Sequence, residues 1–189
     1  MLALIIVCVG PLAAASAEVE FGNSFRLYQL GRYEDSIDAA RAAIKQRHDY
    51  APAWNNIAAA DLALGKWTES AEAASESIRL QPGDNDLARN NLALAKLCLS
   101  NTPEGYVARS QFYFGKGRYD DTIQSAQAAL NLRPDYPEAW NNLAAAYNCL
   151  SRWADAIHAA QRAVELSPHF DLAKNNLALA ERELKKSVK

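Results

Sequence analysis

The side chains that could perform catalysis or bind a metal are few and widely spaced. The sequence contains no glycine-rich phosphate loop, no His-Glu-x-x-His zinc motif and no Gly-x-Ser-x-Gly nucleophile turn. His48, His158 and His169 do not combine with Cys98 or Cys149 into a metal-ligand spacing. We therefore predict no catalytic residue, no metal site and no cofactor, and we expect that the protein is not an enzyme.

Asparagine is the polar residue that follows a regular pattern. An Asn pair, followed by Leu or Ile and then Ala, occurs as Asn55-Asn56, Asn90-Asn91, Asn141-Asn142 and Asn175-Asn176. A side-chain amide is both a donor and an acceptor, which matches the N–H and C=O groups of a peptide backbone without selecting its sequence. The chemistry that this pattern favours is binding.

Composition limits the class of protein that carries these pairs. The 189 residues include 20 Lys and Arg against 22 Asp and Glu, and half of them are hydrophobic. These values exclude a disordered chain, a collagen and a multi-pass membrane protein. The net charge of -2, without a basic run, excludes nucleic acid as a partner. With only 8 Gly and 7 Pro, and with abundant Ala, the chain is expected to be all-helical.

Residues 1–17 form a separate segment without any charged side chain. An apolar run, a Gly-Pro break and the small residues Ala15 and Ala17 before Glu18 are typical of a cleaved secretory signal. We therefore expect an exported protein, either periplasmic or secreted. Because no Lys or Arg precedes the apolar run, the alternative is a membrane-anchored protein that residues 1–17 tether to the bilayer.

The remainder of the chain is repetitive at two scales. Turn landmarks recur after 34 residues, from Gly31 to Gly65 and from Gly117 to Ser151. A longer period of 86 residues relates Trp54 to Trp140 and indicates a duplicated block. Each block holds two 34-residue units and one extra helix, at residues 86–99 in the first copy and 171–186 in the second.

Apolar spacing within a unit predicts a helix, a turn and a second helix. Trp54, Ile57 and Ala58 recur at helical intervals, Gly65 ends that helix, and Thr68 is a plausible N-cap of the next. Helices of about a dozen residues are marginally stable alone. Each pair must therefore pack against the next in a stacked solenoid.

These landmarks resemble the tetratricopeptide repeat (TPR) over residues 20–186. The matching positions are Trp140, Leu143-Ala144, Tyr147, Trp153, Ala156-Ile157, Ala163-Val164 and Pro168, whereas the first unit departs from the pattern with His48 in place of Pro. The resemblance implies a right-handed α-α solenoid of helix-turn-helix TPR-like repeats that acts as a protein-protein interaction scaffold.

The resemblance also implies where a ligand binds. In this family the first helix of each repeat lines a concave groove, and an Asn one residue before the Leu points into it. The groove candidates are Asn56, Asn91, Asn142 and Asn176, with the preceding Asn of each pair at the groove edge. The Lys and Arg residues of a carboxylate clamp are missing, because Leu87 and Asn91 stand where they are expected. The expected ligand is thus an extended, largely uncharged peptide segment.

The predicted organisation is a signal or anchor at residues 1–17, a first TPR block at 18–99, a connecting turn at 100–105 and a second block at 106–186. A half-repeat is inserted between the blocks, so two outcomes remain open. Either the solenoid continues through it, or the stack breaks and the exposed solenoid edges form a homo-dimer. The last helix has a polar outer face typical of a capping helix.

The function expected from these features is a scaffold for a protein or peptide partner. One alternative is that the chain is the TPR tail of a larger membrane-bound enzyme or assembly whose start is internal. A further alternative is a structural protein that assembles through its open solenoid ends.

Overall fold

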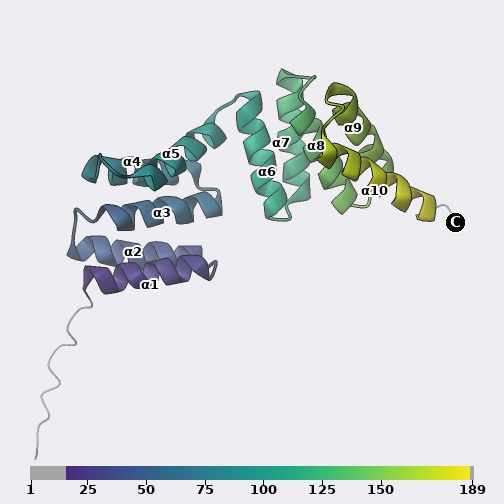
Figure 1. Cartoon of the computed structure of the whole chain (residues 1–189). Coiled ribbons are helices and arrows are strands. Elements are labelled where there is room, and N and C mark those ends of the chain that lie inside the picture. Colours follow the sequence, from purple (N-terminus) through teal and green to yellow (C-terminus); the bar gives the residue numbers. More distant parts are fainter. Residues whose placement is uncertain (1–15, 188–189) are drawn as a thin grey trace, which may run out of the picture. The chain divides into compact units, whose positions relative to one another are not determined.

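The structure is a computed structural model that describes residues 16–187, and within this range it contains ten α-helices and no strand (Figure 1). The predicted all-α class is therefore confirmed. The helices are α1 (Ala17–Gln29), α2 (Tyr33–Gln46), α3 (Ala51–Leu64), α4 (Trp67–Leu80), α5 (Asp86–Leu99), α6 (Pro103–Gly115), α7 (Tyr119–Leu132), α8 (Pro137–Cys149), α9 (Trp153–Leu166) and α10 (Asp171–Ser187).

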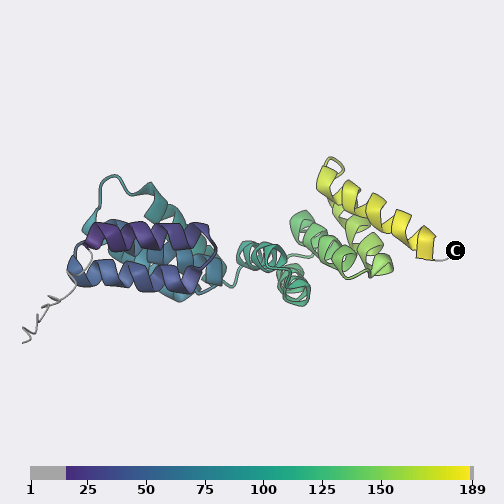
Figure 2. The same cartoon turned by 90° about the horizontal axis from the view of Figure 1, so that it is seen from below.

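The chain forms two compact units, and the division falls within α5, between Leu92 and Ala93. In the N-terminal unit α1 pairs with α2 and α3 with α4, and α3 also packs on α1 and α2 (Figure 1). In the C-terminal unit α6 pairs with α7 and α8 with α9, while α10 packs on both α8 and α9 (Figure 2). Each unit is thus built from stacked helix-turn-helix pairs, as the repeat predicts.

The same small residues form the interior of both units. Ala40, Ala43, Ala58 and Ala74 are fully buried, and so are the residues that follow each of them by 86 positions, namely Ala126, Ala129, Ala144 and Ala160. Alanine loses no side-chain entropy in a helix and lets two helix backbones approach closely. The duplicated block therefore preserves the contacts that set the distance between helices.

An ion pair is also repeated 86 residues later. Arg47, after α2, contacts Glu18 at the start of α1 at 2.7 Å, and Arg133, after α7, contacts Glu104 at the start of α6 at 2.6 Å. Both pairs are exposed to solvent, so their contribution to stability is small. Their repetition shows that the two copies fix the same helix ends together.

The turns between paired helices use a left-handed residue. Gly65 follows α3 with a φ of 77°, and its N–H donates to the Leu62 carbonyl at 3.0 Å. This conformation favours glycine because it has no Cβ. The fourth such turn places Ser151 at a φ of 57°, which is costly for a residue with a side chain.

Helix α6 begins earlier than the predicted connecting turn at 100–105 allows, because residues 103–105 belong to the helix. Thr102 is the N-cap, and its Oγ1 accepts a hydrogen bond from the Gly105 N–H at 3.1 Å. Pro103 takes the first helical position, where no N–H is needed. Gly105 is buried against the end of α5, since a Cβ there would lie 2.5 Å from the Ser100 carbonyl oxygen.

The predicted signal or anchor lies outside the described residues except for its last two positions. Ser16 caps α1 by accepting from the Val19 N–H at 3.4 Å, and Ala17 is buried as the first residue of that helix. Among the helices of residues 16–187, none is both long enough and apolar enough to cross a membrane.

Candidate functional site

The candidate site is built on the first helix of each repeat. These helices are α1, α3 and α5 in the first block and α6, α8 and α10 in the second. Within the C-terminal unit, α8 contacts both α6 and α10, so the three first helices form one continuous face. The four Asn pairs lie on α3, α5, α8 and α10, and the side chains of the groove candidates differ in their hydrogen-bond partners.

Asn56 is engaged in a closed cluster between three helices. Its side chain is only 7% exposed, and Nδ2 donates to the hydroxyl of Ser24 on α1 at 2.5 Å and to that of Ser36 on α2 at 3.2 Å. Each hydroxyl in turn donates to the carbonyl oxygen of the other serine, at 2.7 and 2.9 Å. The amide nitrogen of Asn56 therefore joins α3 to α1 and α2.

Asn142 is the counterpart of Asn56 in the second copy, and it is less enclosed. Its Nδ2 donates to the Ser110 hydroxyl on α6 at 2.6 Å. The position equivalent to Ser36 is Thr122, whose hydroxyl donates to the Arg118 carbonyl at 3.0 Å and is directed along its own helix. Asn142 has no bond to that threonine and stays half-buried.

The remaining two candidates form amide-to-amide hydrogen bonds. Asn91 donates through Nδ2 to Asn55 Oδ1 at 3.0 Å, and Asn176 donates to Asn141 Oδ1 at 2.9 Å. These bonds link α3 to α5 and α8 to α10. Asn55 and Asn141, expected only at the groove edge, therefore orient the groove candidate on the next first helix.

A cavity of about 300 Å³ opens on the first helices of the C-terminal unit. It lies across α6, α8 and α10, and its lining consists of Gln111, Phe114, Asn141, Asn142, Ala145, Leu172 and Asn176. We call it the amide cavity. It brings together two of the four predicted groove residues, Asn142 and Asn176, and no charged side chain lines it.

Apolar side chains flank the amides. Phe114 is 37% exposed and Leu172 is 62% exposed. Sequence reasoning did not select these two residues or Gln111. Leu172 lies one turn before Asn176 on α10, a spacing that is visible in the sequence, whereas Gln111 and Phe114 lie on α6, which carries no Asn.

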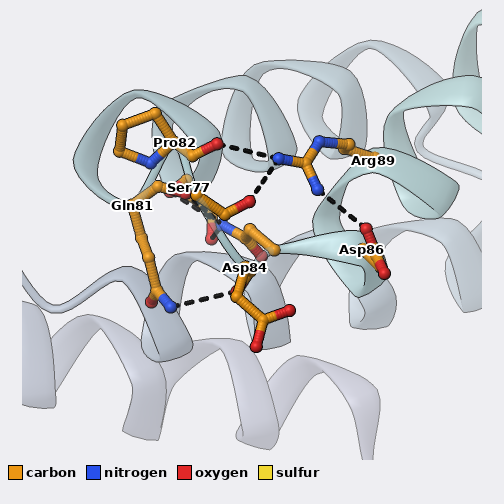
Figure 3. Close-up of polar contacts among 8 residues, drawn as sticks. Ser77, Gln81, Pro82, Asp84, Asp86 and Arg89 are labelled. Atoms are coloured by element: carbon orange, nitrogen blue, oxygen red, sulfur yellow. Dashed lines mark hydrogen bonds and ion pairs between the residues drawn. The ribbon is translucent and has the colours of Figure 1, made fainter.

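The N-terminal unit has a different hollow, of about 270 Å³, that contains Asn55 but neither Asn56 nor Asn91. It lies beside the loop between α4 and α5, which is well braced (Figure 3). Arg89 donates to the Pro82 carbonyl at 2.8 Å and to Asp86 at 2.7 Å, and Gln81 donates to the Asp84 carbonyl at 3.0 Å. Because Asp84 and Asp86 line it, this hollow lacks the uncharged character of the amide cavity.

Among the residues that the structure describes, no group of three or more His, Cys, Asp or Glu side chains could hold a metal ion. Cys98 is buried, Cys149 is exposed, and both are free thiols. The chemistry that the described side chains offer is therefore hydrogen bonding through amides and contact through exposed apolar groups.

Comparison with known structures gives a similar fold at low identity. The MamA protein is 15% identical with a TM-score of 0.45, and the match covers 89% of this chain and 82% of that chain. The APC/C hetero-tetramer Cut9-Hcn1 is 19% identical with a TM-score of 0.46, and the match covers 90% of this chain but only 37% of that chain. The TPR2AB domain of yeast Sti1, in complex with pHSP90, is 17% identical with a TM-score of 0.44, covering 90% and 84%. No curated protein sequence matches.

Family models match both copies of the duplicated block. A model described as TPR repeat matches residues 111–148, and two described as tetratricopeptide repeat match residues 137–170 and 26–85. The matches cover most of the described helices and repeat the division into blocks. The chain belongs to the tetratricopeptide repeat family.

Proposed function

We propose that the protein is a non-catalytic interaction scaffold whose amide cavity binds a short, extended and uncharged peptide segment. The observation that carries this proposal is the lining of the cavity, which combines four side-chain amides with exposed apolar groups and no charge. Ligand sites of this kind use a few placed polar groups for orientation and apolar groups for contact area. At about 300 Å³ the cavity suits only a few peptide residues.

The amides retain hydrogen-bonding capacity. Each Asn side chain has two N–H donors and an oxygen with two lone pairs. Asn142 uses one donor on Ser110, and its Oδ1 accepts no hydrogen bond from the described residues. Gln111 makes no side-chain hydrogen bond within residues 16–187. These two residues, on adjacent helices, can therefore donate to a peptide carbonyl and accept from a peptide N–H.

The apolar flank favours a hydrophobic side chain on the ligand. Phe114 and Leu172 expose enough surface for a ligand side chain to cover, and burial of apolar area contributes about 25 cal/mol per Å². A charged side chain would lose its hydration in the cavity without gaining a partner there. The preferred ligand thus has apolar side chains and a backbone whose N–H and C=O groups are available for hydrogen bonds.

A steric variant tests the proposal without breaking the amide bonds. Ala145 lines the cavity, and Ala59 is the same position in the first copy, 86 residues earlier, where it lines no described cavity. A displayed library of short random peptides is selected against the full chain, and affinities are measured by fluorescence anisotropy. We expect Ala145→Leu to weaken binding at least tenfold and Ala59→Leu to leave it unchanged. Equal binding by both variants, or no selected peptide, would contradict the proposal.

We further propose that the scaffold meets its partner outside the cytoplasm, supported by the uncharged segment at residues 1–17. Fractionation of the native cells with N-terminal sequencing tests this. A mature start at Glu18 in a soluble extracytoplasmic fraction is the expected result. A retained segment in the membrane fraction would instead support the tethered form, or the tail of a larger assembly.

A further inference from the structure

A larger cavity lies within the N-terminal unit. It measures about 470 Å³ and is lined by residues of α2, α3 and α4. Four carboxylates line it, from Asp61, Glu69, Glu72 and Glu76, together with the guanidinium of Arg41 and the ring of Trp54. We call it the acidic cavity. It does not share any residue with the amide cavity.

Asp61 is the residue that requires an explanation. Its side chain is only 4% exposed, yet its carboxylate makes no hydrogen bond and no ion pair with any described residue. Burial raises the pKa of Asp61, and the more distant charge of Lys66 only partly opposes that effect. Asp61 lines the cavity, so its carboxylate is available to a donor that enters there.

Trp54 lacks a partner in the same wall. Its Nε1 is buried and has no hydrogen-bond acceptor among residues 16–187. Trp140, its counterpart in the second copy, donates to the Pro134 carbonyl at 2.8 Å. Trp54 therefore contributes the surface of its ring to the acidic cavity, whereas its N–H is buried beneath that surface.

The two copies of the block differ at most polar positions of this cavity and agree at its apolar ones. Ala73 and Trp54 are preserved as Ala159 and Trp140, and Glu69 is matched by Asp155. In contrast, Asp61 is replaced by Tyr147, Glu72 by His158 and Glu76 by Arg162. His158 packs edge-on against Trp140, with 5.8 Å between ring centroids. The negative lining is consequently a property of the first copy and does not follow from the repeat itself.

The charges that remain unpaired indicate the type of ligand. Glu76 already accepts a two-pronged bond from Arg79, at 2.6 and 2.7 Å. Asp61, Glu69 and Glu72 then face a single positive charge on Arg41, which leaves the cavity negative. The described acidic side chains are not grouped closely enough to share a metal ion. An extended organic cation with several donors suits carboxylates that are spread along a wall.

We infer that the acidic cavity binds the side chain of a basic residue, arginine or lysine, from a partner peptide. The cationic group donates to Asp61 and lies between Glu69 and Glu72, while the aliphatic stem packs on Trp54. The net negative charge of the lining and the ring of Trp54 suit one cationic side chain on an aliphatic stem. This site is separate from the proposed peptide site in the C-terminal unit, so the two can succeed or fail independently.

Titration calorimetry of the full chain with acetyl-arginine-amide tests the inference, with spermidine as the comparison probe. The wild-type protein should bind the blocked arginine saturably. Asp61→Asn, which preserves shape and removes the charge, should weaken binding at least about tenfold, the effect of losing one charged hydrogen bond. Glu138→Gln makes the same charge change at an exposed position outside the cavity and should leave binding unchanged.

Each other outcome overturns the inference. Absence of saturable binding would show that the cavity does not recognise this group. Equal affinity for the wild type and Asp61→Asn would show that the carboxylate is not the recognition element. Binding of spermidine but not of acetyl-arginine-amide would assign the cavity to free polyamines. Because Asp61→Asn relieves a buried charge, it should fold, and a melting curve verifies this in the same samples.

Discussion

Asn56 and Asn142 occupy the same position of the repeat, yet replacing each by Ala should have different effects on stability. Asn56 donates to two hydroxyls, those of Ser24 and Ser36, whereas Asn142 donates only to that of Ser110. Asn175 is exposed, makes no side-chain hydrogen bond with the described residues, and serves as the matched control.

The magnitudes follow from the bonds removed. A neutral hydrogen bond contributes about 1 kcal/mol. Ser24 and Ser36 keep their own bonds to carbonyl oxygens, so Asn56→Ala leaves no unpaired donor and removes about 2 kcal/mol in two bonds. Ala is the better helix former by about 0.5 kcal/mol. The expected net losses are about 1.5 kcal/mol for Asn56→Ala and about 0.5 kcal/mol for Asn142→Ala, against a small gain for Asn175→Ala.

Urea unfolding followed by circular dichroism measures the free energies, and amide hydrogen exchange locates the change. Asn56→Ala should speed exchange in α1, α2 and α3, because the cluster joins these helices. Equal losses for Asn56→Ala and Asn142→Ala, after subtraction of the Asn175→Ala effect, would show that the second hydrogen bond of Asn56 does not stabilise the fold. Unchanged hydrogen exchange in α1 would show that the cluster does not hold this helix.

Three further substitutions probe other features of the fold. Asp61→Asn should stabilise the protein at neutral pH. Burial raises the pKa of Asp61 in the folded state, so wild-type stability falls as the pH rises above about 4, the pKa of an unfolded Asp. Urea unfolding at several pH values should show the stability advantage of the variant grow in the same direction. Ser151→Gly should raise the stability by about 1 kcal/mol, since Ser151 has a φ of 57°. Gly117→Ser, at a φ of 70°, should lower the stability by a similar amount. Thermal melting measures both changes, and stability changes of the same sign would exclude the backbone explanation. Gly105→Ala should cost at least about 2 kcal/mol, because its Cβ would lie 2.5 Å from the Ser100 carbonyl oxygen, and a neutral effect in urea unfolding would show that α5 and α6 separate easily.

Periodicity predicted the helices well because it depends on local spacing. The extra helix expected at residues 86–99 is α5, and the last expected helix at 171–186 is α10 with one more residue. The beginning of α6 was missed because Gly105 suggests a turn in the sequence. Its actual requirement is the close approach of Ser100 and Leu97, which only the packing reveals.

The candidate site could be predicted in part. The Asn positions are visible in the sequence, but their partners depend on residues far along the chain. Replacement of Ser36 by Thr122 in the second copy redirects one hydroxyl to its own helix, and Asn142 is left beside a cavity where Asn56 is enclosed. Identical Asn-Asn motifs therefore differ in the exposure of their side chains, because the hydrogen-bond partners that set this exposure lie far away in the sequence. Whether the solenoid continues through residues 99–106 stays a prediction.

The proposed peptide site at the amide cavity is tested most directly by a two-dimensional NMR titration of the side-chain amides with a peptide selected against the full chain. We expect the largest shifts at Gln111, Asn142 and Asn176, with little change at Asn56. Shifts confined to the N-terminal unit, or saturation without any change at these three amides, would exclude binding at this cavity.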